Sequence, residues 1–287
     1  MVHAALQQEV QEPILNVKNL NKRYGKGCSH CETPDLLTSQ DNRCPHCGSV
    51  WACIDVNLEL YKGEIVGIVG ESGSGKSSFV KSLYFDDDIT SGEAMISDYK
   101  NGEVNIFCES AQQKRYIRNY LLGMVYQNPL LGLKMSFSSG GNIAEKLIAS
   151  GSLHVGDIRQ RAGELLNHVE ISLSRMDELP KNFSGGMQQR VQISKALANN
   201  PPLLLLDEVT TGLDLSVQAR VLDLIRKIQR ELNVAMIVVS HDLGVIRMLA
   251  DRTMVMRYGR VVEHGLTDQI LEDPQHPYTQ QLVHSLL

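Results

Sequence analysis

The chain has 287 residues, of which 43% are hydrophobic and 21% are charged, a composition typical of a soluble globular protein. Its formal net charge of −5 argues against a protein that mainly coats nucleic acid. The longest apolar runs, 203–206 and 234–239, are too short to cross a bilayer, and residues 1–13 lack the basic and apolar regions of a secretion signal.

The first part of the chain predicts strands on both sides of a polar loop. Residues 14–24 alternate apolar and polar side chains, as a half-buried strand does. Residues 28–47 are rich in Pro, Asp, Asn, Ser and Gly and indicate a loop. Residues 54–70 predict a strand, a Lys-Gly turn and a buried strand. A helix over 76–85 and short strands with turns over 93–108 are expected to follow.

The second part is predicted to be helical before strands return. Helical segments are expected near 141–150, 157–170 and 185–198, then buried strands within 201–208 and 233–242. Between these strands, 215–232 predicts an amphipathic helix. Its apolar face comprises Val217, Val221, Leu224, Ile225, Ile228 and Leu232. The alternation predicts a mostly parallel α/β core with a helical insertion, and the absence of an internal repeat predicts one nucleotide-binding unit.

Four of the six cysteines form two Cys-x-x-Cys pairs, Cys28 with Cys31 and Cys44 with Cys47. In a chain with no visible secretion signal they favour the cytoplasm, where such pairs indicate metal or redox chemistry. Four thiolates suit tetrahedral Zn²⁺, although the gap of twelve residues between the pairs is shorter than the usual ribbon spacing of about 15–20. Iron, an iron–sulfur centre and a labile disulfide remain alternatives.

The other histidines and cysteines nearby receive weaker assignments. His30 and His46 lie inside the pairs and are expected to point away from the metal, although either could replace a thiolate. Cys53 and Cys108 are single cysteines and are expected to be packing residues.

Residues 70–77, GESGSGKS, fit the phosphate-loop pattern G-x-x-x-x-G-K-[ST] between a predicted strand and a predicted helix. The loop backbone is expected to surround phosphate oxygens at the positive end of the helix. Lys76 would reach the β- and γ-phosphates, and the Ser77 hydroxyl would bind Mg²⁺. The other residues assigned to nucleotide binding here are Gly70, Ser72, Gly73, Ser74, Gly75 and Ser78.

Asp207 and Glu208 directly follow the apolar run 203–206. Ligands bind α/β sheets at the carboxyl ends of their strands, so both carboxylates are expected at such an edge. We expect Asp207 to hold Mg²⁺ through water and Glu208 to polarise the water that attacks ATP.

Residues 183–190, FSGGMQQR, resemble the signature of the ATP-binding-cassette (ABC) ATPases. The resemblance implies a RecA-like, mostly parallel core with an antiparallel β subdomain and a helical subdomain. It also implies a head-to-tail homodimer in which one unit's signature contacts the ATP of the other. The signature residues are Ser184, Gly185, Gly186 and Gln188.

The same family pattern assigns four further residues. Tyr24 would stack on adenine, and Gln127 would contact Mg²⁺ and the attacking water. Asp214 would lie at the dimer interface, and His241 would contact the γ-phosphate. One departure is Val209, where the family usually has proline; both acids are intact, so we expect activity to survive.

Two branches of this family compete. Residues 265–282 resemble both the ATPases of oligopeptide importers and PhnK, the ATPase subunit of bacterial carbon–phosphorus lyase. Residues 125–162, with GGNI at 140–143 and GDIR at 156–159, favour PhnK. The resemblance then implies docking on the lyase core in phosphonate breakdown, through the Gln127 loop and residues 138–143. The alternative partners are membrane permease subunits.

The family pattern also locates the cysteine segment. The separation of Tyr24 from Gly70 exceeds the family's usual length, so 27–53 is expected to be a zinc-ribbon-like insertion after the adenine-stacking residue. We expect it within a single nucleotide-binding domain, 13–287, whose helical subdomain is 128–199. The segment 28–47 has one Arg, no Lys and three acids, so no nucleic-acid partner is expected.

Overall fold

Six strands form the central sheet of the computed structural model, which describes residues 12–32 and 41–285. In spatial order they are β5 (Leu122–Val125), β6 (Leu203–Asp207), β7 (Ala235–Val239), β3 (Ile65–Val69), β8 (Arg252–Arg257) and β9 (Arg260–Leu266). The first five run parallel and β9 is antiparallel to β8. Strands β3, β6 and β7 are buried along their whole length, as apolar runs covered on both faces should be.

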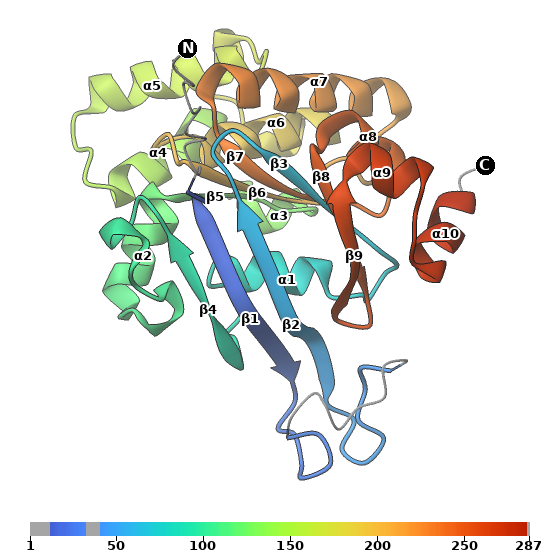
Figure 1. Ribbon diagram of the computed structural model, residues 1–287. Coiled ribbons are helices and arrows are strands. Elements are labelled where there is room, and N and C mark those ends of the chain that lie inside the picture. Colours follow the sequence, from blue (N-terminus) through green and yellow to red (C-terminus); the bar gives the residue numbers. More distant parts are fainter. Residues whose placement is uncertain (1–11, 33–40, 286–287) are drawn as a thin grey trace, which may run out of the picture.

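A second, antiparallel sheet has the order β2-β1-β4, with β1 (Leu15–Tyr24), β2 (Val50–Leu60) and β4 (Ser91–Ile96). The ends of β1 and β2 project away from the rest of the molecule and carry the cysteine loops (Figure 1). Strand β2 begins at Val50, before the predicted start at residue 54, because 51–54 are all buried and show no alternation.

The prediction of several strands in 93–108 is wrong after β4. Two 3₁₀ turns, Lys100–Gly102 and Ile106–Cys108, follow that strand. Asn101 has a left-handed backbone with φ of 58°, and the Asn105 side chain accepts a hydrogen bond from the Phe107 N–H. Both are turn-forming features of asparagine that compete with strand pairing.

Two apolar layers hold the sheets and helices together. Leu203 and Leu205 face a core shared with the antiparallel sheet and α1 (Lys76–Leu83), whereas Leu204 and Leu206 face the other core. That second core lies under α6 (Gly185–Ala196), α7 (Leu215–Leu232) and α8 (Leu243–Leu249). Helix α7 confirms the predicted amphipathic helix, although Leu232 at its end is exposed. The chain closes with α9 (Thr267–Glu272) and α10 (Pro277–His284) beside β9 (Figure 1).

The predicted helical stretch contains α3 (Pro129–Gly132), α4 (Ser139–Ala149), α5 (Val155–His168) and α6. It is joined to the core by Lys146 of α4, whose Nζ donates to the Arg118 carbonyl at 2.6 Å, near the end of α2 (Ala111–Tyr120). Burial, and next the charge of Arg118, lower the pKa of Lys146 to about 7. This hydrogen bond to a carbonyl in the last turn of α2 anchors α4 to that helix. Among the described residues, no helix combines the length and apolar character needed to span a bilayer.

Candidate functional site

The phosphate loop connects β3 to α1, and its backbone is packed too closely for side chains at two glycines. A Cβ on Gly70 would lie 2.1 Å from the Met256 carbonyl oxygen, and one on Gly75 would lie 1.9 Å from that of Ala52. Both glycines also have positive φ, 149° and 109°. These contacts explain why the phosphate-loop pattern needs glycine at both positions in this chain.

Lys76 curls back over this loop. Its Nζ donates to the carbonyl oxygens of Gly70 (2.8 Å) and Glu71 (2.9 Å), so the ammonium is held against the loop backbone. Burial lowers the pKa of Lys76, and the nearby Glu208 and Asp207 carboxylates oppose that shift. A buried cation beside backbone N–H groups favours an anionic ligand such as a triphosphate. Ser72 and Gly73 are exposed at the outer turn of the loop.

Ser77 and Asp207, two of the three residues predicted to contact Mg²⁺, are in contact with each other. The Ser77 hydroxyl donates to Asp207 Oδ1 at 2.7 Å, although the residues come from α1 and β6. Burial raises the pKa of Asp207, and this hydrogen bond opposes the rise. A hydroxyl oxygen next to a buried carboxylate is the hard oxygen donor set that Mg²⁺ prefers.

Glu208 gathers the other predicted catalytic side chains. Its Oε2 accepts a hydrogen bond from Gln127 Nε2 at 3.0 Å and lies 3.3 Å from His241 Nδ1. The Glu208 backbone has a left-handed φ of 47°, an unusual conformation for glutamate of the kind often found at functional sites. Gln127 has no described hydrogen bond to Ser77 or Asp207, the other two residues predicted to contact Mg²⁺, so in this structure it is grouped with Glu208.

Thr211 is a neighbour of Glu208 that sequence reasoning missed. Its hydroxyl donates to Glu208 Oε2 at 3.2 Å, from one turn further along the chain. The sequence signal for this contact is that Thr211 lies three residues after Glu208, because residues so separated in a tight turn lie close together.

The signature residues lie away from this group, at the start of α6. Ser184 caps the helix, its Oγ accepting from the Met187 N–H at 3.4 Å, and Gln188 Nε2 donates to the Pro180 carbonyl at 3.0 Å. Ser184 and Gly185 are exposed, whereas Gly186 is packed against Val217. Among the described residues, no hydrogen bond joins the signature to the phosphate loop of the same chain.

Asp214 is likewise exposed and caps α7. Its Oδ1 accepts hydrogen bonds from the Ser216 hydroxyl at 2.7 Å and the Val217 N–H at 3.0 Å. The hydrogen bond from Ser216 and then that from Val217 lower the pKa of Asp214, so the cap is a carboxylate near neutral pH.

Tyr24 ends β1 next to the phosphate loop. Its hydroxyl donates to Asp87 Oδ2 at 2.7 Å and lies 3.2 Å from Ser78 Oγ, two residues after Lys76. Burial raises the pKa of Tyr24 to about 12, although the residue remains 40% exposed. Its ring is therefore fixed at one end and accessible beside the loop, as a base-stacking side chain must be.

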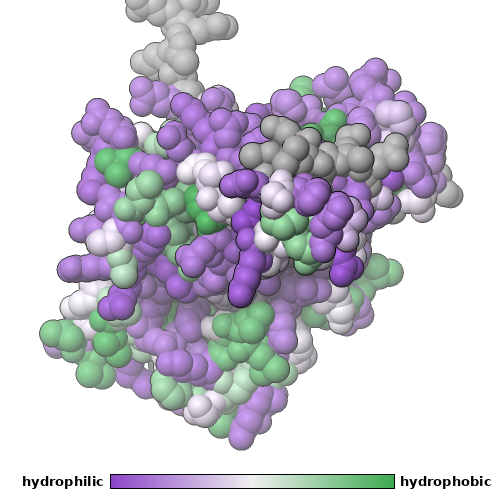
Figure 2. All heavy atoms as spheres, turned by 90° about the horizontal axis from the view of Figure 1, so that it is seen from below, coloured by the Kyte–Doolittle hydropathy of each residue, from purple (hydrophilic) through white to green (hydrophobic). Residues whose placement is uncertain are grey.

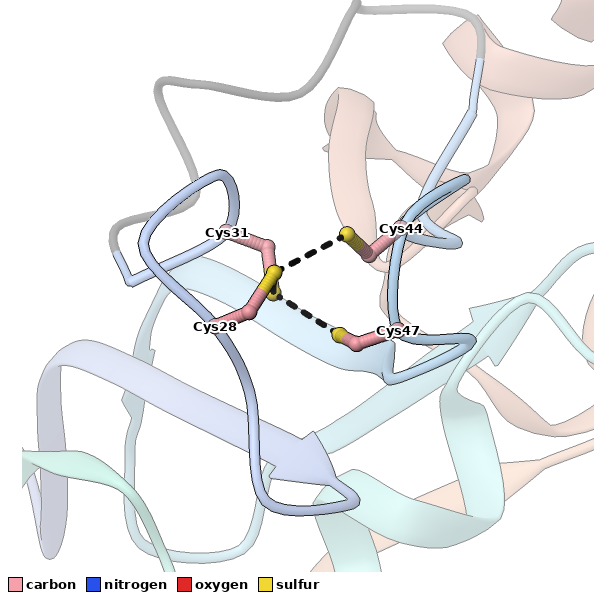
Figure 3. A group of neighbouring side chains, drawn as sticks. All are labelled: Cys28, Cys31, Cys44 and Cys47. Atoms are coloured by element: carbon pink, nitrogen blue, oxygen red, sulfur yellow. Dashed lines mark hydrogen bonds between the residues drawn. The ribbon is translucent and has the colours of Figure 1, made fainter.

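The four paired cysteines form one cluster (Figure 3). The Sγ–Sγ distances are 3.8 Å for Cys28–Cys31, 3.7 Å for Cys28–Cys44 and 3.5 Å for Cys31–Cys47, and all four sulfurs lie within 4.8 Å of one another. A tetrahedron with Zn–S bonds of about 2.3 Å has S–S edges of about 3.8 Å, so the cluster has the right size. The sulfurs are too far apart for disulfides, whose S–S length is about 2.05 Å.

The neighbours of the cluster match the predictions in part. His30 and His46 stack on each other, with ring centroids 3.8 Å apart, and neither belongs to the four-donor group. Cys53 is buried as expected, but the packing assignment for Cys108 is wrong because that residue is exposed.

Seen from the end that carries these loops, the surface is mostly hydrophilic with separate apolar patches (Figure 2).

Comparison with known proteins agrees with this geometry. The family described as ABC transporter matches residues 53–211. The "Putative phosphonates utilization ATP-binding protein PhnK" of Escherichia coli K12 is 46% identical over 280 residues, covering 97% of this chain and 99% of that protein. The oligopeptide transport ATP-binding protein OppD of Bacillus subtilis is 39% identical over 246 residues, covering 83% of this chain and 67% of that protein.

Solved structures show the same fold. The ATP-binding cassette MJ0796, a dimer in a post-hydrolysis state bound to ADP and Pi, is 30% identical with a TM-score of 0.72, covering 88% of this chain and 98% of that one. The cbiO1 structure from Clostridium perfringens is 25% identical with a TM-score of 0.73, covering 92% of each chain.

The packing of the phosphate loop yields a first test. Gly75→Ala is expected to lower the affinity for a fluorescent ATP analogue at least about tenfold, because its Cβ would clash with Ala52 and a strained φ costs roughly 1–3 kcal/mol. Gly151→Ala is the matched control, since Gly151 also has positive φ but open space around it, outside the site. Unchanged affinity in the Gly75 variant would contradict the geometry described for the loop.

Proposed function

The chain belongs to the ABC transporter family and is an ATPase related to PhnK, and from this premise we propose that it drives a conformational change in a carbon–phosphorus lyase complex during phosphonate breakdown. The observation that carries the proposal is the PhnK match, which extends over nearly all of both chains. The match to the peptide importer OppD leaves a third of that protein uncovered. The second candidate is an importer ATPase that binds permease subunits. Its support is the match to OppD, whose identity to this chain is lower than that of PhnK.

Within one chain, different parts of the site would bind the phosphates, bind Mg²⁺ and activate the attacking water. Bound MgATP supplies the phosphoryl group and the cation that neutralises it. Lys76 and the loop backbone would hold the phosphates, and Ser77 of α1 and Asp207 of β6 would hold the Mg²⁺ ion. Glu208 accepts the proton of the attacking water, and its contacts with Gln127 and His241 fix the carboxylate toward the γ-phosphate.

We place the signature in a head-to-tail homodimer. The exposed Ser184 and Gly185 lie at the start of a twelve-residue helix whose N–H groups are available to the phosphates of a second chain. Asp214, also exposed, would lie beside them at the interface. The dimeric state of the solved cassette MJ0796 supports this arrangement.

An apolar surface near the Gln127 loop supports docking on a large partner. Leu130, Leu131 and Phe137 are 65%, 64% and 46% exposed, and they lie between Gln127 and the start of α4. Neighbouring exposed apolar side chains mark interaction sites more often than free surface. A partner bound here would contact the loop that reaches the catalytic carboxylate through Gln127.

We also propose that the four cysteines hold a structural Zn²⁺ ion. The sulfur cluster has the dimensions of a tetrahedral thiolate site, and its buried members, Cys31 and Cys44, come one from each pair. Iron binds the same four-thiolate set, so the identity of the metal is an outcome of the test below.

Replacing the catalytic carboxylate tests the ATPase assignment. Glu208→Gln is expected to slow hydrolysis at least about 100-fold, the usual effect of removing a general base, while ATP binding persists. In the presence of MgATP and its physiological partner proteins, the variant should accumulate as a dimer. Size-exclusion chromatography with light scattering measures this state. Asp223→Asn, an exposed carboxylate on α7, is the control. Persistent monomers under these conditions would refute the dimer.

Affinity purification from the native host tests the partner. A tagged chain is expected to capture lyase subunits, and the double variant Leu130→Glu/Leu131→Glu is expected to lose them because charge is placed on the apolar surface. Leu266→Glu, an exposed leucine on β9, should capture as well as the unaltered chain. Capture of integral membrane permease subunits without lyase subunits would establish the importer instead.

Metal analysis of protein purified without added zinc tests the cysteine site. We expect about one zinc ion per chain by mass spectrometry, lost in Cys44→Ser, which removes a buried ligand, and kept in Cys108→Ser. Iron in place of zinc would correct the identity of the metal, and absence of any stoichiometric metal would exclude the site.

A further inference from the structure

The cysteine cluster has a small apolar core of its own. Cys31, Cys44, Trp51 and Ile54 pack together, separate from the two large cores of the protein. Trp51, near the start of β2, is only 2% exposed, and its indole N–H donates to the Cys31 carbonyl at 3.3 Å. The first residues of β2 therefore pack against the cysteine cluster. The position of the N-terminal end of β2 thus depends on how the two Cys-x-x-Cys turns are held.

Arg23, at the end of β1, makes the matching contact from the other strand. Its guanidinium donates to the Cys31 carbonyl at 3.1 Å and to the Lys26 carbonyl at 3.2 Å. The same group lies over the Trp51 ring, 5.1 Å from its centroid. Two side chains from paired strands thus converge on one carbonyl of a metal-binding turn. Arg23 directly precedes Tyr24, whose ring lies beside the phosphate loop.

The same strand ends continue to the phosphate loop through backbone contacts. The carbonyl of Ala52, the residue after Trp51, packs against Gly75. Gly259, in the turn between β8 and β9, donates its N–H to the Ser74 carbonyl at 2.9 Å, and its own carbonyl accepts from the Ile54 N–H at 2.8 Å. A Cβ on Gly259 would lie 2.7 Å from the Trp51 carbonyl oxygen. A closely packed path therefore leads from the cysteines to the loop.

We propose that Arg23 and Trp51 are positioning residues that couple metal binding at the cysteine cluster to ATP binding. This inference rests on the proposed metal centre and the proposed nucleotide site. The metal joins the two turns and fixes the Cys31 carbonyl, and that carbonyl fixes Arg23 and Trp51. Arg23 then fixes the end of β1, whose last residue is Tyr24, and Trp51 holds β2 against the phosphate loop.

The coupling predicts a specific kinetic effect of metal removal. Chelated protein is expected to show a KM for ATP roughly two- to tenfold higher with kcat nearly unchanged, since an aromatic stack contributes about that factor to binding. Glu208, Gln127 and His241 do not contact the cluster, so the chemical step should be preserved. Linkage requires that nucleotide strengthen metal binding by the same factor by which metal strengthens nucleotide binding.

Trp51 makes the experiment direct, because it is the one tryptophan of the chain. Its emission is expected to shift to longer wavelength when the metal is removed, which reports on the cluster independently of ATPase activity. A fluorescent ATP analogue titrated into metal-loaded and chelated protein gives the nucleotide affinity, and competition with a chelator gives the metal affinity with and without nucleotide.

Variants separate coupling from folding. Arg23→Gln should keep the metal, raise KM for ATP even in metal-loaded protein, and reduce the effect of the chelator on KM, since the Trp51 contact with the Cys31 carbonyl remains. Arg23→Lys should restore part of the affinity. Arg43→Gln, which alters an exposed arginine between the two turns, is the matched control and should behave as the unaltered chain.

The outcomes distinguish the inference from the proposals beneath it. Failure to bind any stoichiometric metal, on purification or on reconstitution, overturns the metal centre and the coupling together. A shifted Trp51 emission with unchanged nucleotide affinity and unchanged KM overturns the coupling alone, and leaves both the metal centre and the ATPase in place.

Discussion

The order of four parallel strands at one edge of the central sheet determines which side chains can meet. Strands β5, β6, β7 and β3 end there in that spatial order. Gln127 follows β5, Asp207 ends β6 and Glu208 follows it, His241 follows β7, and the phosphate loop follows β3. Because these strands are parallel, their carboxyl ends and the side chains that follow them share one edge. The contacts of Glu208 with Gln127 and His241, and of Asp207 with Ser77, are consequences of that order.

The antiparallel sheet is equally part of the nucleotide site. It supports the phosphate loop from outside, through the contact of the Ala52 carbonyl with Gly75, and it supplies Tyr24 at its exposed end. The phosphate loop is thus fixed between two sheets. The central sheet provides the predicted catalytic side chains, and the antiparallel sheet provides the Ala52 backbone that packs against the loop and the Tyr24 ring. The cysteine segment between β1 and β2 is far along the chain from Asp207 and Glu208, yet it lies next to the end of this sheet.

Much of the fold is predictable because its signals are local. Three kinds of local pattern predict the element in which they lie. The apolar runs predict β6 and β7, the amphipathic pattern predicts α7, and the glycine spacing predicts the phosphate loop. Prediction fails where tertiary contacts decide. Strand β2 starts early because Trp51 is buried under the cysteine cluster, and the region after β4 turns because asparagines cap their own backbone. The grouping around Glu208 was expected only through family resemblance, since no sequence spacing reports contacts between β5, β6 and β7.

The cysteine segment has a consequence for how the protein is made. Tyr24 and Val50 are paired in register, and the connection between them is long. Closing a loop of that length costs about 2 kcal/mol more than closing a two-residue hairpin. On the proposal of a bound metal, cross-linking the two turns offsets this entropy, so the last strand pairs form after the ion is captured. Maturation of the enzyme then depends on the host's zinc supply, and chains synthesised under zinc starvation would carry a frayed hairpin open to proteases.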